Sequence, residues 1–261
     1  MNKVKKSFLL TILVTVAFFS CGDISDPLAS YIIDEPYNFP LKPGTPEWAN
    51  LETGIDKVDA VQIPQDIASR MTTRSLVETC LNYPLFHWVV ADDSTVKKGM
   101  DKLIKQFNGF TELLKRRDAY IYLSEKFLSF DPLAVTNEGW GLLEKGDYMY
   151  ELIKIELLLA QDIVLKPAIY KNKKSLLKEA LLKYEKMLTQ PEYYTLFDYE
   201  PLFLLMGKIL QNSGKPDISS LVVKNKEIYN FLETGWIYDK YGFVNYNILN
   251  EILSIAKKVC S

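Results

Sequence analysis

The sequence predicts an all-α fold, an irregular stacked array of helices, with a compact helical bundle as the alternative. From about Ile55 onward, apolar residues recur at helical spacing and prolines fall between the periodic segments. Strand signals are scarce. The best runs from Trp236 to Val244, where loosely alternating aromatic residues indicate a short hairpin or an irregular loop. No fixed repeat period is present, which argues against a regular repeat protein.

The helical domain is expected to span residues 55–261, with eight to ten helices of roughly 10 to 20 residues. A stripe from Met100 to Phe107 is expected to end at a left-handed cap formed by Asn108 and Gly109. Between residues 148 and 163, apolar side chains cover most of the helical circumference. This pattern predicts a central helix that is buried by its neighbours.

Three further stripes follow toward the C-terminus. Residues 177–188 form one, with Glu179 and Lys183 expected to pair at i, i+4 on the solvent side. Residues 218–232 are expected to form one helix, with Asp217 as its N-cap. Residues 249–260 form the last.

Residues 1–20 have the layout of a lipoprotein signal peptide. Three lysines precede an apolar run of twelve residues, and Ser20 supplies the small residue before Cys21. The run is shorter than the roughly 20 residues that a transmembrane helix needs. We therefore expect a palmitate-bearing lipid on Cys21 and a membrane anchor; the alternative is an ordinary secreted protein.

Residues 21–54 are expected to form an acidic, proline-containing tether. Between Gly22 and Ala60 there are eight acidic and two basic residues, and the spaced prolines favour extended backbone. Aromatic residues such as Phe39 and Trp48 indicate that the second half of the tether lies along the domain surface.

Composition and charge limit the possible functions. Apolar residues make up 48% of the chain and aromatic residues 13%, which is too rich for a disordered chain. Beyond residue 60 the domain carries 26 basic and 25 acidic residues. This near-neutral balance gives no electrostatic footprint for nucleic acid. Cys80 and Cys260 either form one disulfide or remain two buried thiols.

A stretch between Gln62 and Tyr120 resembles a run found in uncharacterised helical lipoproteins and secreted proteins of Bacteroides-type gut bacteria. The resemblance covers about a quarter of the chain and implies a Gram-negative envelope address, with no functional residue to carry over. It rests on Gln62-Ile63-Pro64, Met71-Thr72-Thr73, Leu76-Val77, Cys80-Leu81-Asn82-Tyr83-Pro84-Leu85 and Phe107-Asn108-Gly109-Phe110.

Signatures of catalysis are sparse. His87 is the one histidine, no Gly-x-Ser-x-Gly motif accompanies it, and packing at a helix end explains it. No phosphate loop or metal-ligand motif is present, so neither a cofactor nor a metal is expected.

The most site-like segment is residues 191–201, where acidic residues alternate with aromatic rings. Paired carboxylates can hydrolyse glycosidic bonds, and aromatic faces bind sugars. The alternative is a connector whose rings pack on the core and whose acids cap the next helix. The candidate ligand-binding residues are Tyr193, Tyr194, Asp198, Tyr199 and Glu200.

Together these patterns predict a lipid-anchored cell-envelope protein at the outer membrane. Its helical domain is expected to bind a partner, protein or glycan, without catalysis. A glycan-directed hydrolase that uses the acids of residues 191–201 is the alternative.

Overall fold

The computed structural model describes residues 32–90 and 95–261. Fourteen α-helices and two 3-10 helices make up this part of the chain, and it contains no β-strand beyond two isolated bridges. The all-α prediction is therefore confirmed. The helices are α1 (Pro46–Ala49), α2 (Gly54–Ala60), α3 (Gln65–Arg70), α4 (Thr73–Leu81), η2 (Phe86–Val90), α5 (Val96–Gln106), α6 (Asn108–Leu113), α7 (Ala119–Ser129), η3 (Pro132–Thr136), α8 (Leu142–Leu159), α9 (Asp162–Leu165), α10 (Tyr170–Leu188), α11 (Leu196–Gln211), α12 (Pro216–Lys224), α13 (Lys226–Thr234) and α14 (Tyr246–Cys260).

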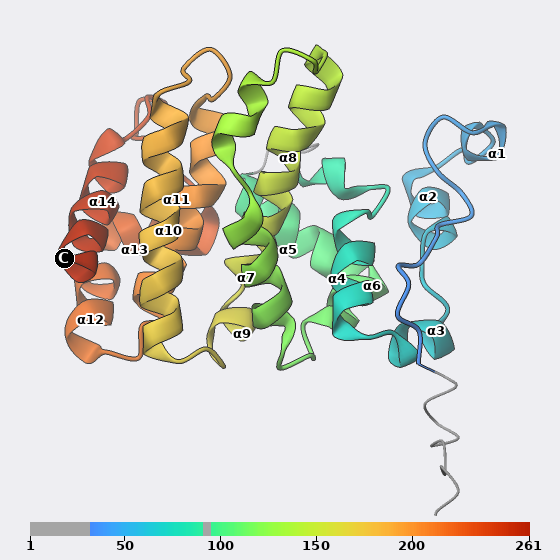
Figure 1. Ribbon diagram of the computed structural model, residues 1–261, viewed down its shortest axis with the longest axis horizontal. Helices are drawn as coiled ribbons and strands as arrows, with labels where there is room; N and C mark the ends of the chain where they lie inside the picture. Colours follow the sequence, from blue (N-terminus) through green and yellow to red (C-terminus); the bar gives the residue numbers. More distant parts are fainter. Residues whose placement is uncertain (1–31, 91–94) are drawn as a thin grey trace, which may run out of the picture. The chain divides into compact units, whose positions relative to one another are not determined.

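Residues 33–261 form one packed unit in which helices contact their neighbours in an order close to that of the chain. The helices α7, α8, α10 and α11 lie side by side (Figure 1). Next along the chain, α12, α13 and α14 pack on α11 and on one another. This serial packing matches the expected stacked array.

Two helices form the centre of the unit. The C-terminal half of α8, from Leu152 to Leu159, is largely buried, as its apolar pattern predicted. In α11 every residue from Pro201 to Leu210 is buried. Gly207 allows the close approach of α13, because a Cβ there would lie 2.5 Å from a methyl group of Leu232. The most deeply buried helix is thus α11.

The second half of the expected tether packs against the helical domain. Ile33 pairs with Met71 in a parallel bridge: its N–H donates to Arg70 and its carbonyl accepts from Thr72, at 2.9 and 2.8 Å. Phe39 is only 3% exposed and packs against Phe107. Residues 33–54 therefore belong to the folded unit. Residues 1–31, including the expected signal peptide and Cys21, lie outside the described residues.

Three local predictions are wrong. Asn108 and Gly109 begin α6 rather than cap α5, because the Asn108 side chain bonds both backbone groups of Ile63, at 3.0 and 2.6 Å. The expected helix 218–232 is two helices, since Asn225 caps α13 and ends α12. Asp217 lies in the first turn of α12 and is not its cap.

Within the described part of the chain, no helix combines the length and the apolar character needed to cross a bilayer.

Candidate functional site

In the segment 191–201, Asp198 has a structural role. Its Oδ2 accepts hydrogen bonds from the Thr195 backbone N–H at 2.7 Å and from the Thr195 hydroxyl at 2.9 Å. Together the two residues form a capping box at the start of α11. Asp198 is also only 9% exposed, so its carboxylate is positioned to begin the helix rather than to meet a ligand.

The tyrosines of this segment mostly pack inward. Tyr194 is 3% exposed, and its hydroxyl donates to the carbonyl of Pro132 at 2.7 Å. Tyr199 packs edge-on against Tyr184, with ring centroids 5.5 Å apart. Tyr193 is half-buried beneath the Lys145 ammonium, which lies 4.8 Å from the ring centroid. The three rings do not line a common groove.

Glu200 differs from its neighbours. One carboxylate oxygen is buried without a hydrogen-bond partner among the described residues, and burial raises the pKa of this group to about 7. Asp198 and Glu200 are two residues apart on one helix, so they do not face each other. The structure therefore does not bring these acids together as a catalytic pair.

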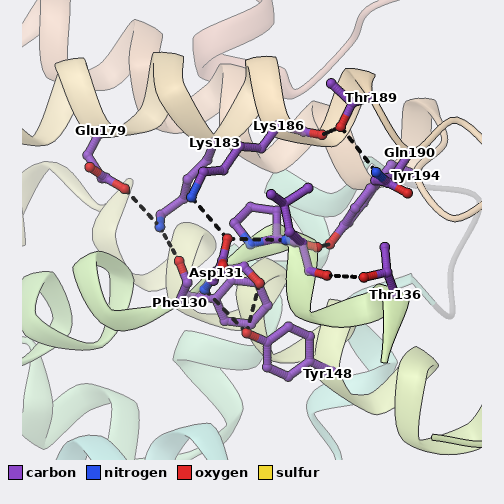
Figure 2. Close-up of polar contacts among 12 residues, drawn as sticks. Phe130, Asp131, Thr136, Tyr148, Glu179, Lys183, Lys186, Thr189, Gln190 and Tyr194 are labelled. Atoms are coloured by element: carbon purple, nitrogen blue, oxygen red, sulfur yellow. Dashed lines mark hydrogen bonds and ion pairs between the residues drawn. The ribbon is translucent and has the colours of Figure 1, made fainter. Parts of the chain in front are cut away.

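A polar network ties η3 to α10 beneath this segment (Figure 2). Lys183 is 1% exposed, contrary to the expectation of a solvent-facing pair. Its ammonium donates to the carbonyl of Phe130 and, at 3.2 Å, to Glu179. Lys186 pairs with Asp131 at 3.0 Å. These bonds hold the start of η3 against α10.

Glu156 of α8 lies close to this network. It is 0% exposed, and neither carboxylate oxygen has a hydrogen-bond partner among the described residues. Burial raises the pKa of Glu156 well above its ordinary value, the Lys183 charge lowers it, and Asp198 raises it further. Sequence patterns gave no sign of this residue, because a polar residue in an apolar helix is not marked by periodicity.

A different surface carries the features of a binding site. A hollow of about 420 Å³ opens between α13, the following loop and the start of α14. We call it the aromatic hollow. It is lined by Glu227, Asn230, Trp236, Tyr238, Asp239, Lys240, Tyr241, Asn245 and Ile248.

The loop that forms the hollow is anchored at its base. Gly235 ends α13 with a φ of +71°, and a Cβ there would lie 2.6 Å from the Thr95 hydroxyl of α5's N-cap. The same hydroxyl donates to the carbonyl of Thr234. Ile237 is fully buried, and its carbonyl accepts from the Asn245 backbone N–H at 2.8 Å. These contacts fix both ends of the loop.

The tip of the loop is fixed by Asp239. Its Oδ1 accepts from the backbone N–H groups of Tyr241 and Phe243, at 2.8 and 3.0 Å. Gly242 turns the chain with a φ of +83°. Tyr238 and Val244 then form one antiparallel bridge, so the segment is a minimal hairpin.

Five aromatic side chains project from this hairpin and the start of α14. Trp236 and Tyr238 pack edge-on, with centroids 5.4 Å apart. Exposed aromatic rings on a hydrogen-bonded loop are costly to leave in water and are typical of binding surfaces. The exposed fractions are 46% for Trp236, 38% for Tyr238, 71% for Tyr241, 72% for Phe243 and 62% for Tyr246.

The sequence indicated the hairpin but not the hollow. Its aromatic alternation from residue 236 to 244 is visible in the chain, whereas Glu227 and Asn230 reach the same place from α13. Whether the α13 side chains lie beside the hairpin depends on tertiary structure, which the sequence pattern does not show.

Other candidate groups remain separate. His87 is exposed in η2, and Cys80 and Cys260 are free, with burial raising the pKa of both thiols. No cluster of three or more histidine, cysteine or acidic side chains suited to a metal occurs among residues 32–90 and 95–261.

Comparison of the chain with protein-family models, with curated proteins and with solved structures finds no match in any of the three. The resemblance to Bacteroides-type lipoproteins stays a prediction.

Proposed function

We propose that this chain is a lipid-anchored protein of the bacterial cell envelope whose helical domain binds a partner, protein or glycan, without catalysis. The aromatic hollow is the binding surface in this proposal. The observation that carries it is a hollow of about 420 Å³, a size typical of ligand sites, that is lined by the exposed rings of Trp236, Tyr238 and Tyr241.

The rigidity of the loop supports a binding role. Binding costs less when the surface is already ordered, because fewer side chains and backbone bonds lose freedom in the complex. Here Asp239 and the buried Ile237 hold the loop before any partner arrives. The exposed rings are therefore presented outward on a fixed frame.

The acids at the hollow have positioning contacts that support non-catalytic binding. Asp239 Oδ1 accepts two backbone N–H groups, and Glu227 Oε2 accepts from the Asn245 side chain at 3.2 Å.

The hydrolase alternative retains one supporting observation, the pKa of Glu200 near 7, which suits a general acid. Asp198, its proposed partner, is engaged in the capping box. If the Glu200→Gln variant hydrolyses glycans at the same rate as the parent protein, the hydrolase alternative is ruled out.

The envelope address is the part of the proposal that rests on sequence. The signal layout of residues 1–20, with Cys21 directly after Ser20, supports a lipid anchor. The outer membrane is proposed from the resemblance over residues 62–120.

A capture experiment tests the binding role. The full chain, purified in a detergent without a sugar headgroup and immobilised, would be exposed to envelope extract from its host. We expect it to retain a component that Trp236→Ala and Tyr241→Ala fail to retain. Tyr229→Ala is the matched control, because Tyr229 is 43% exposed on α13 but does not line the hollow. Equal retention by all four proteins, or by none, would contradict the proposal.

A further inference from the structure

We infer that the aromatic hollow takes an uncharged oligosaccharide, an inference that rests on the proposed function above. Three properties of the hollow lead to it: the accessible aromatic rings, the polar groups between them and the sign of their charge.

The rings offer apolar faces at different angles. The planes of Trp236 and Tyr238 meet at 65°, with centroids 5.4 Å apart, so the two rings form adjoining walls rather than a single stack. Tyr241 adds a more exposed ring at the loop tip. A pyranose ring has a face of C–H groups that packs against such aromatic surfaces, while its hydroxyls remain at the edge.

The polar side chains between the rings match hydroxyl groups. Glu227 and Asp239 each keep one carboxylate oxygen beyond the bonds already described, and both can only accept. The side-chain amide of exposed Asn230 has no protein partner among the described residues, and it both donates and accepts. Sugar hydroxyls also do both, so one ligand can satisfy all three groups.

A protein partner fits these walls less well. The centre of a protein interface is depleted of charged residues, because covering a charge without a hydrogen bond is costly. An apolar peptide on these rings would cover Glu227 and Asp239 and could offer them only its backbone N–H groups as donors. A glycan removes this cost, since each hydroxyl is a donor.

The charge of the hollow sets the class of glycan. Its lining carries two carboxylates and one ammonium group. That ammonium, on Lys240, lies 4.9 Å from the Tyr241 ring centroid at the loop tip. Uronic acids, sulfated sugars and anionic lipid headgroups would therefore meet net negative charge. Neutral sugars are not repelled by this charge.

The test begins with titration calorimetry on the full chain in the detergent described above. The probes are hexasaccharides of cellulose, xylan, mannan, starch and chitin, with polygalacturonate and heparin as charged probes. We expect at least one neutral probe to bind, a loss of about tenfold or more in Trp236→Ala and Tyr241→Ala, and no loss in Tyr229→Ala. Binding of charged probes alone, or equal binding by all variants, would overturn the inference.

The capture experiment separates this inference from the proposed function. Envelope extract is treated with periodate, which cleaves vicinal diols of sugars, or with proteinase K. Retention that periodate abolishes and proteinase K leaves intact supports a glycan, including one outside the probe set. Retention that only proteinase K abolishes overturns the glycan inference but leaves the binding role standing. If nothing is retained through the hollow, both fail.

Discussion

At the scale of single residues, Glu156 is the least expected feature of the core. Its carboxyl group is fully buried without a hydrogen-bond partner among the described residues, near the buried ammonium of Lys183. Desolvation opposes the charged form of an acid, and the raised pKa shows that it outweighs the attraction of Lys183. The folded protein therefore favours the neutral acid.

Substitution of this residue should change how stability depends on pH. In the unfolded chain Glu156 ionises near its ordinary pKa of 4.5, whereas in the folded state it resists ionisation. Its protonated form thus stabilises the fold fully below about pH 4.5, and this contribution is lost as pH rises. Glu156→Gln should raise the free energy of unfolding at pH 8 by roughly 1 kcal/mol or more, with little change at pH 4.5.

Urea unfolding at both pH values measures the effect. Glu185→Gln, at an exposed position of α10, is the control and should change neither value. A Glu156→Gln variant that is less stable at pH 8 than the parent would show that pairing with Lys183 dominates instead.

At the scale of elements, the approach of α5 to η2 depends on one missing side chain. A Cβ on Gly99 would lie 1.9 Å from the carbonyl oxygen of Val89 and 2.7 Å from its carbonyl carbon. Both are backbone atoms, so no side-chain rotation can make room. The two helices can pack at this distance only with glycine at position 99.

Gly99→Ala should therefore lower the free energy of unfolding by about 2–4 kcal/mol. Gly146→Ala is the matched control, since Gly146 lies in α8 with nothing within 4 Å of its would-be Cβ. This control should gain about 0.5–1 kcal/mol from helix propensity. Thermal or urea unfolding measures both. A loss in Gly99→Ala below about 0.5 kcal/mol would refute the close approach.

The apolar periodicity predicted the long helices, because burial of one helix face requires apolar residues at a regular spacing in the sequence. In the described part of the chain six α-helices have 10 to 20 residues, fewer than the expected eight to ten, because α4, α12 and α13 have nine residues each. The five shorter helices have too few turns to show a period. The predicted helix boundaries were wrong where an asparagine side chain forms hydrogen bonds with the backbone. Asn225 divides one apolar stripe into two helices, and Asn108 begins a helix where a cap was expected.

The candidate site was less predictable than the fold. The pattern of acidic and aromatic residues in residues 191–201 is the same whether these side chains face a ligand or the core. The capping by Asp198 and the bond from Tyr194 to Pro132 are visible only once the helices are packed. Likewise, the hairpin from residue 236 to 244 becomes a hollow only beside α13.

At the scale of the whole molecule, the proposal joins a membrane anchor to a binding domain. The folded unit begins at Ile33, so roughly a dozen residues separate it from Cys21. Extended chain spans at most about 3.3–3.6 Å per residue, so a tether of this length allows a reach of about 40 Å.

The anchor is testable in cells. Cys21→Ser should abolish labelling with a palmitate analogue and release the protein from the membrane fraction, because the thiol is the proposed attachment point. Cys80→Ser is the control, since the Cys80 thiol is buried in the core. Unchanged membrane retention of Cys21→Ser would refute the anchor.

Hydrogen exchange of the full chain, with and without the retained envelope component, tests the binding surface most directly. Amides that a partner covers or stabilises exchange more slowly. We predict that slowing is concentrated in residues 235–248, around the aromatic hollow. Slowing in residues 191–201, with none in residues 235–248, would contradict the account.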